Sequence, residues 1–518
     1  MYLNQNAKKQ SEKCFTYDLT RGIEGSGSSR QGRIISAMNV SQNEDARISP
    51  MDVFYRKSCP NDAISVGSYL GGVYYNSGDG FYFNGERKGD LSVGEKVYVN
   101  FSGRVYIFPD RSYYDINEDK FDCFYRSITG KIRIEVNNYQ YAASYMYPDS
   151  GNLAEVFCES HSIKVNAANN IDYNGCYQIN KVDKEKGKVY FGLLEGEIGG
   201  TIVDDVSLSN DVPALRGACV CKNRIFGYIG NKIYASVLGD PMSWCVKLDG
   251  GAGSYVYENT GGEDFTACTS SEDQPIFFTP DNIYKLYGSN VGEYSLRLIS
   301  GFGGISDGLF GAHAKVLGDI YFVCGNSIVK FTGSRSDIVC RLSGGLITSF
   351  LCSPYYTKLY FCYRSDSGEH LCALDVLRGT IYEINIAGVK GLFNLCGNIC
   401  AMTGTEIIAL EGKRKALPEG FVADGEILSS IEFYEIHNDW DRFSSSKLYL
   451  RGKIMRGGEV EIYCMLANCG EWSPVYKITE EGERLWEFSL PASLTDSFRL
   501  KIEGSGAYCL NNIYVLFS

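Results

Sequence analysis

Long apolar runs and helical periodicity are both missing from this sequence of 518 residues. No stretch approaches the roughly 18 apolar residues of a membrane-spanning helix, and no apolar pattern at helical spacing continues beyond about two turns. The first ten residues, Met-Tyr-Leu-Asn-Gln-Asn-Ala-Lys-Lys-Gln, lack the hydrophobic region of a secretory signal peptide. The sequence therefore predicts a soluble protein, made in a cytoplasm, with little helix.

Histidine and tryptophan are scarce, with four residues of each. None of the histidines, His313 among them, has a neighbour at metal-ligand spacing, and no G-x-S-x-G elbow, phosphate-binding loop or H-E-x-x-H segment occurs. Adjacent carboxylates such as Asp204 and Asp205 stand in polar, turn-like stretches and are expected to be solvated. We therefore predict no catalytic residue, no metal site and no cofactor, and expect that the chain is not an enzyme.

Positive charge is in deficit. The chain has 50 Lys and Arg against 62 Asp and Glu, which gives a formal net charge of −12 and a pI near 5.1. This balance argues against a protein that grips DNA by neutralising its phosphates. A wall past which DNA slides without binding is not excluded, because an acidic surface repels the phosphates.

Cysteine is plentiful, with 19 residues, but its spacing does not predict a metal or redox site. The pairs Cys396/Cys400 and Cys464/Cys469 match neither a zinc ribbon nor a Cys-x-x-Cys motif. Several cysteines, such as Cys324, stand among strand residues, where a reduced thiol is a small apolar filler. We expect reduced cysteines in the core.

A repeat occupies residues 215–412. Each copy has an apolar strand, a short polar turn, and a second strand that ends near a Gly, as in Arg224-Ile-Phe-Gly-Tyr-Ile-Gly-Asn-Lys-Ile-Tyr-Ala. Successive equivalent positions are 50, 45, 45 and 34 residues apart, and they are Tyr234, Tyr284, Val329, Leu374 and Ile408. A period near this length, with Asn and Asp in the turns, is typical of β-propeller blades. A large sandwich or barrel with evenly spaced strands is the alternative.

The rest of the chain divides around this repeat. Residues 51–121 have the same hairpin pattern and are predicted to be the first part of the propeller, with residues 212–412 as its remainder. Residues 122–211 are predicted to be an inserted small β-barrel. Residues 1–50 are Gly- and Ser-rich with few apolar positions, and predict an extended arm that lies across a partner or is disordered. Residues 420–518 alternate apolar and polar positions and predict a jelly-roll-like β-sandwich.

Two tryptophans in the predicted sandwich, Trp440 and Trp472, are candidates for stacking on a ligand ring. Core packing explains a Trp more often than ligand stacking does. These two residues are the only ligand-contacting candidates that we take from the sequence.

Several segments resemble a family of tailed-bacteriophage virion proteins, related to the tail-stabilisation or nozzle proteins of phages and prophages of Firmicutes. The most specific similarity is Asn231-Lys-Ile-Tyr-Ala-Ser-Val-Leu-Gly-Asp-Pro-Met-Ser-Trp244, which matches the family pattern Ile-Tyr-x-Ser-x-x-Gly-Asp-Pro-x-x-Trp. Others are Gly103-Arg-Val-Tyr-Ile-Phe-Pro-Asp-Arg111 and Asp496-Ser-Phe-Arg-Leu-Lys-Ile-Glu-Gly504. In the early stretch that ends Arg47-Ile-Ser-Pro50, Met51 stands where the family has a basic residue.

The resemblance implies a structural protein of the tail or neck, located in the virion after assembly in the bacterial cytoplasm. Its partners would be its own copies in a ring, with a hexamer as one option, other tail, portal and adaptor proteins, and DNA that passes through the channel during ejection without sequence-specific binding. On this hypothesis residues 1–50 and 122–211 carry the contacts between subunits. The alternative is a host-surface tail protein that binds polysaccharide through its sandwich. A glycosidase built on the propeller would need two carboxylates converging at the disc centre.

Overall fold

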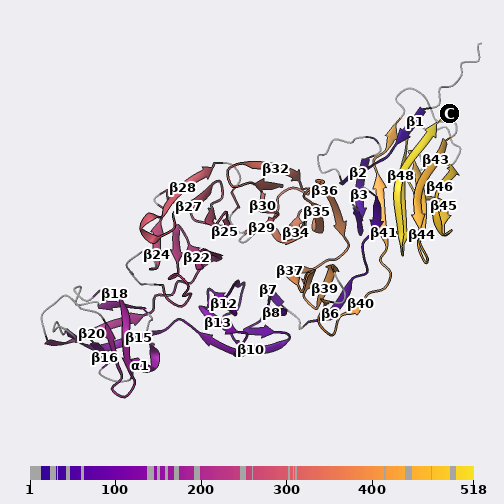
Figure 1. The fold of residues 1–518 in the computed structure, drawn as a ribbon. Helices are drawn as coiled ribbons and strands as arrows, with labels where there is room; N and C mark the ends of the chain where they lie inside the picture. Colours follow the sequence, from indigo (N-terminus) through magenta and orange to yellow (C-terminus); the bar gives the residue numbers. More distant parts are fainter. Residues whose placement is uncertain are drawn as a thin grey trace, which may run out of the picture.

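The computed structural model describes residues 13–23, 31, 33–42, 47–59, 63–136, 145–148, 152–157, 162–167, 174–191, 199–244, 253–259, 261–301, 304–306, 309, 312–342, 344–412, 416–437, 446–467, 470–490 and 497–517. The prediction of an all-β chain is confirmed, because 63% of the residues are in strands and 2% are in helices. Helical structure among them is confined to short pieces such as α1 (Leu153–Val156) and η3 (Val291–Glu293). Three bodies follow one another in Figure 1: a barrel, a ring of sheets and a sandwich.

The central body consists of seven consecutive antiparallel sheets, as counted over the described residues. In the first six sheets four strands are paired in chain order, so that each forms a simple meander, whereas the seventh also contains a strand from an earlier part of the chain. The first three sheets are β7 to β10 (Ala63–Tyr69, Gly72–Ser77, Gly80–Phe83, Glu86–Asp90), β11 to β14 (Val97–Phe101, Arg104–Phe108, Ser112–Asp115, Lys120–Cys123) and β21 to β24 (Gly217–Cys221, Arg224–Ile229, Lys232–Ala235, Tyr255–Glu258). The next three are β25 to β28 (Ala267–Ser271, Gln274–Phe278, Ile283–Tyr287, Ser295–Ser300), β29 to β32 (His313–Val316, Asp319–Cys324, Ser327–Phe331, Ser336–Arg341) and β33 to β36 (Ser349–Tyr355, Lys358–Ser365, Gly368–Asp375, Thr380–Ile384).

The seventh sheet is completed from the N-terminal part of the chain. Its strands β37 (Val389–Leu395), β38 (Asn398–Thr403) and β39 (Glu406–Glu411) are followed by β6 (Tyr55–Ser58) and the short β40 (Val422–Ala423). Ile408 of β39 pairs with Arg56 of β6. The Arg56 guanidinium is 2.7 Å from both Glu406 and Asp424, so one side chain joins all three outer strands of this sheet.

The seven sheets are equivalent in their local geometry. Two residues connect the first and second strands of every sheet, and the first of the two adopts φ between 47° and 51°, although none is a glycine. These residues are Leu70, Ser102, Lys222, Glu272, Leu317, Tyr356 and Cys396. The repeat read from the sequence falls in register with this arrangement, because Tyr234, Tyr284, Val329, Leu374 and Ile408 all lie on the third strand of their sheets.

Hydrophobic clusters join each sheet to the next and continue around the ring. One cluster joins the first and second sheets through Phe81 and Val105, for example, and another joins the sixth and seventh through Tyr360 and Ile399. The cluster that contains Val73 and Phe393 joins the seventh sheet back to the first. These interfaces bury large apolar side chains on both faces of a sheet, which provides most of the driving force for holding neighbouring sheets together.

The Gly-Asp-Pro segment of the sequence motif forms a turn that seats a tryptophan between two sheets. Asp240 accepts hydrogen bonds from the Met242 amide at 2.9 Å and from the Ser243 hydroxyl at 2.6 Å. The indole of Trp244 then donates to the Pro241 carbonyl at 2.8 Å and packs edge-on against Phe108 of the second sheet. The motif is therefore a packing element between the second and third sheets.

Six strands form a closed barrel within the range for which the sequence predicted an insertion. In spatial order they are β15 (Ser127–Val136), β16 (Tyr145–Pro148), β19 (Lys188–Phe191), β18 (Gly175–Asp183), β17 (Ser162–Ala167) and β20 (Gly199–Ser209). Residues such as Ile163, Val189 and Leu208 fill its interior. The barrel leaves the ring between the second and third sheets (Figure 1).

The sandwich contains strands from both ends of the chain. One sheet has the order β4 (Val40–Gln42), β5 (Ile48–Pro50), β48 (Tyr508–Phe517), β43 (Ser446–Ile454), β46 (Gly482–Ser489), with β1 (Lys13–Thr16) also paired to β48. The facing sheet contains β3 (Arg33–Met38), β41 (Ser429–Phe433), β47 (Ser497–Ser505), β44 (Glu459–Leu466) and β45 (Ser473–Ile478), with β2 (Asp18–Ile23) beside β3 and β42 (Ile436–His437) beside β47. Met38 also pairs with Glu383 of β36, so this sheet is continuous with the sixth sheet of the ring.

This arrangement corrects the prediction of an extended arm for residues 1–50. Its described part supplies five strands of the sandwich, and Ile34, Ala37 and Ile48 are fully buried in the sandwich core. The Asn39 side chain donates to the Leu428 carbonyl across 389 residues of sequence. The segment has too few apolar residues to form a core of its own. Its strands instead complete a core to which the C-terminal residues contribute most of the side chains.

Truncation of the buried side chain in β3 should therefore destabilise the sandwich. For Ile34→Ala we expect a loss of about 2–5 kcal/mol in the free energy of unfolding, because the deleted methyl groups leave a cavity. Val53→Ala, at an exposed position between β5 and β6, should cost less than about 0.5 kcal/mol. Urea unfolding followed by circular dichroism measures both, and equal stability of the two variants would favour an arm over core strands.

Candidate binding cavity at the centre of the sheet ring

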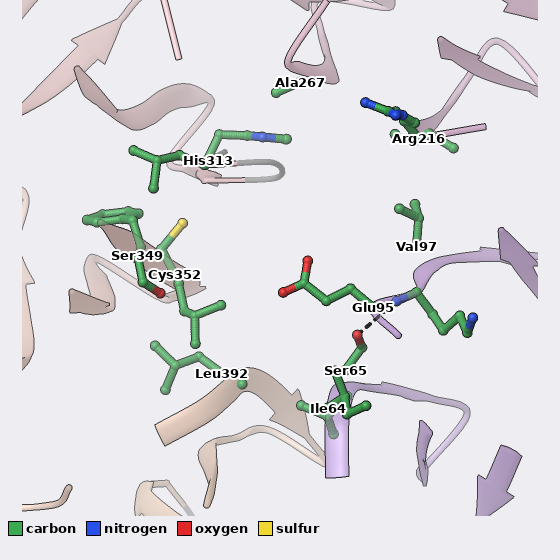
Figure 2. Close-up of a pocket in the computed structure, with 18 of the residues that line it drawn as sticks. Ile64, Ser65, Glu95, Val97, Arg216, Ala267, His313, Ser349, Cys352 and Leu392 are labelled. Atoms are coloured by element: carbon green, nitrogen blue, oxygen red, sulfur yellow. Dashed lines mark hydrogen bonds between the residues drawn. The ribbon is translucent and has the colours of Figure 1, made fainter. Parts of the chain in front are cut away.

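A cavity of about 710 Å³ lies where the first strands of the seven sheets begin. Each sheet contributes lining residues from its first strand or from the residue before it, among them Ile64, Val97, Arg216, Ala267, His313, Ser349 and Leu392. Figure 2 shows these side chains around a common space, with Glu95 extending into it. Since ligand sites in proteins are typically cavities of this size, it is the leading candidate for a functional site.

Three charged side chains of the cavity have no ionic partner among the described residues. Glu95 precedes β11, Arg216 precedes β21, and Lys390 is the second residue of β37. All three are exposed, and none takes part in an ion pair within 4 Å. Two cations and one anion are therefore free to pair with a ligand.

A buried ion pair between Lys96 and Asp110 lies next to the cavity and fixes the backbone that carries Glu95. The Lys96 ammonium is 2.7 Å from Asp110 and also donates to the Ser92 hydroxyl at 2.8 Å. Burial by itself would raise the pKa of Asp110, but hydrogen bonds from Lys96 and Ser92 outweigh it and lower that pKa. Since the pair is buried, it fixes the Lys96 side chain and with it the backbone on either side, which carries Glu95 and Val97.

His313 lies on the opposite side of the cavity, at the start of β29. Its ring stacks on Phe278 with a centroid distance of 6.0 Å, and its Nδ1 atom is buried without a hydrogen-bond partner. Desolvation by burial lowers the pKa of His313 to about 4, so the imidazole is neutral at physiological pH. No hydrogen bond connects it to Ser349 or Cys352, the hydroxyl and thiol nearby in Figure 2.

Two further hollows adjoin the central cavity. One of about 440 Å³ shares Ile64, Glu95 and Lys390 with it and extends to Arg364. The other, of about 290 Å³, shares Arg216 and extends to a group of acidic residues, Glu263, Asp264 and Asp281. The three hollows together cross this face of the ring.

The tryptophans proposed from the sequence do not line this cavity. Trp440 lies outside the described residues. Trp472 is half-buried on the outer face of the sandwich, where the Arg499 and Lys501 side chains lie 5.7 Å and 5.2 Å from its ring centre. Arg499 is in turn paired with Glu432. The ring is thus engaged in cation–π contacts within the chain.

Sequence reasoning did not find the cavity residues. Glu95, Arg216, His313 and Lys390 are spread over nearly 300 residues of the chain and match no motif. Their common feature is position, since each stands at or just before the start of a first strand or, for Lys390, one residue into it. Superposition of the repeats on the first strand would have brought them together.

Two features are absent from the residues that the structure describes. None of their helices is long and apolar enough to cross a membrane. They also contain no cluster of three or more His, Cys, Asp or Glu side chains that could hold a metal ion. The cavity is lined by charged side chains, hydrogen-bonding groups and apolar side chains.

Comparison with known proteins gives no family for this chain. No family model and no curated protein matches it. Among solved structures, similarity is found to a nidogen/laminin complex (9% identity, 53% of this chain and 86% of the other, TM-score 0.26). It is also found to an exported protein of Bacteroides fragilis NCTC 9343 (9%, 56% and 96%, 0.27) and to glutaminyl cyclase of Myxococcus xanthus (11%, 41% and 91%, 0.23). At these TM-scores the matches support no inference about this chain.

The low pKa of His313 predicts a pH dependence of stability. The unfolded chain binds a proton at this residue below about pH 6.5, and the folded chain does so only below about pH 4. The free energy of unfolding should therefore fall, by at most about 3 kcal/mol, as the pH decreases through this window. Urea unfolding at a series of pH values measures how the free energy of unfolding depends on pH. This dependence should be weaker for His313→Phe than for the wild type.

His437→Gln, at an exposed position of the sandwich, is the matched control and should retain the wild-type pH dependence. If the free energy of unfolding changed equally with pH in His313→Phe and in the wild type, the assignment of a lowered pKa to His313 would be contradicted.

Proposed function

We propose that the seven sheets are the blades of a β-propeller, closed by β6, and that the chain is a structural virion protein of a tailed bacteriophage. In this proposal it assembles with its own copies into a ring around the DNA channel of the tail or neck. The barrel and the sandwich lie on different sides of the sheet ring (Figure 1), which gives each copy three bodies with which to contact neighbours.

The observation that carries the assembly part is a repeated apolar surface on the outer rim. Val256, Leu298 and Ile338 lie on the outermost strands of three consecutive sheets and are 55%, 57% and 49% exposed. They occupy equivalent places, because each pairs with a repeat position on the third strand, namely Tyr234, Tyr284 or Val329. In the proposal this recurrence in register places one exposed aliphatic side chain of each of the three sheets at the contact with a neighbouring copy.

The backbone of these strands adds to the surface. Among the described strands, β24, β28 and β32 are terminal in their sheets, so no described strand pairs with the outer side of each. Such edges pair readily with another chain unless they are protected by charge, proline or a cover. A large aliphatic residue in the middle of each strand favours a contact with a neighbouring subunit over protection.

The resemblance and the charge supply the rest of the proposal. The Gly-Asp-Pro-x-x-Trp segment that carries the strongest resemblance has a structural role here, in which Trp244 packs between two sheets. The net charge of −12 suits a protein that surrounds DNA without retaining it. Among the described residues, no observation favours polysaccharide binding through the sandwich, since Arg499 and Lys501 already lie over the Trp472 ring.

Mass photometry of the purified chain tests the assembly. We expect species at discrete multiples of 57.5 kDa that appear as rings in negative-stain images. A variant with Val256→Arg, Leu298→Arg and Ile338→Arg should remain monomeric, because each arginine places charge in the contact. Its melting curve should match that of the wild type, since all three positions are on the surface.

The matched control changes three exposed aliphatic residues away from the rim surface, Val93→Arg, Leu317→Arg and Leu485→Arg. It should assemble as the wild type does. Rings of normal yield from the rim variant would show that this surface is not the contact.

A further inference from the structure

The three connected hollows differ in charge from one end to the other. One end is lined by two cations, Lys390 and Arg364, together with Glu95, and its net charge is positive. The other end is lined by three acidic residues, Glu263, Asp264 and Asp281, together with Arg216, and its net charge is negative. Lys390, Asp264 and Asp281 are all exposed, and none of them takes part in an ion pair with another described residue. Arg364 is 59% exposed and has a single, long contact of 3.3 Å to Glu369.

The middle of this path is apolar. Val66, Val97, Leu351 and Leu392 line the central cavity from four different sheets. The neutral ring of His313 lines the same cavity from a fifth sheet and is stacked on Phe278. A large apolar side chain placed here would be removed from water, which favours binding.

We propose that this path binds an extended polypeptide segment of a partner protein, in which an acidic residue, a large apolar residue and a basic residue follow one another. The acidic residue pairs with Lys390 and Arg364, the apolar side chain enters the central cavity, and the basic residue pairs with Asp264 and Asp281. The inference goes beyond the assembly of the ring and does not rest on it, because the rim surface and this path share no residue.

The charges favour a polypeptide over other ligands. A nucleic acid presents one sign of charge throughout, so its phosphates would meet Glu95, Asp264 and Asp281 without compensation. A polypeptide carries both signs at chosen positions and an apolar side chain between them. Opposite charges at the two ends also fix the direction in which the segment lies.

Fluorescence anisotropy with labelled synthetic peptides and the full-length chain tests the proposal. The probe series has the form Asp-spacer-Phe-spacer-Lys, with acetylated and amidated ends and glycine spacers of increasing length. The controls replace both charged residues with Asp, with Lys or with Ser. We expect at least one probe of mixed charge to bind about tenfold more tightly than all three controls of the same length.

Charge reversal on the protein provides the second readout. Lys390→Glu should weaken binding of the mixed-charge probe about tenfold and strengthen binding of the control with two lysines. Lys453→Glu, at an exposed lysine of the sandwich, is the matched control and should change neither. Both positions are on the surface, and thermal melting checks that both variants are folded.

Three results would overturn the proposal. They are equal affinity of mixed-charge and serine peptides at every spacer length, equal affinity of Lys390→Glu and Lys453→Glu for the probe, and tighter binding of an oligothymidine than of any peptide. None of these results depends on whether the chain forms rings, so failure here is distinguishable from failure of the assembly proposal.

Discussion

The pairing of β6 with β39 is the constraint on which the rest of the structure depends. It joins a segment before the first sheet to the last sheet, and Arg56 connects it to Glu406 and Asp424. The cluster that contains Val73 and Phe393 and the hydrogen bond from the Ser68 hydroxyl to the Asn394 carbonyl complete the contact between the seventh and first sheets. Without this closure the first strands would not surround one cavity, and both ends of the series would expose apolar faces.

The same segment of chain ties the ring to the sandwich. Immediately before β6 the chain passes through β3, β4 and β5, which belong to the sandwich core, and Met38 pairs with Glu383 of the sixth sheet. The Asn39 backbone N–H donates to the Glu383 carbonyl at 2.8 Å, and its side-chain oxygen accepts from the Asn385 amide at 2.9 Å. A continuous sheet and a shared core limit rotation between the two bodies, which suits a component that must keep its shape in an assembly.

The sequence pattern predicted the features of the fold that depend on strands pairing with their neighbours in sequence. The all-β class and the third-strand positions Tyr234, Tyr284 and Val329 follow from hairpins whose partners are close in sequence. The roles of residues 33–58 could not be predicted in this way, because Ala37 pairs with Ile431 and Arg56 pairs with Ile408. The local sequence contains no information about partners so far away in the chain. For the same reason the sequence did not predict the cavity, whose lining residues come together only when the ring is closed.

The most direct test of the account is electron cryomicroscopy of the assembled full-length chain at a resolution that shows side chains. The account predicts a closed ring of copies with Val256, Leu298 and Ile338 at the contact between neighbours and an open channel on the symmetry axis. Copies that meet through other surfaces with these three side chains in solvent, or particles without a channel, would contradict it.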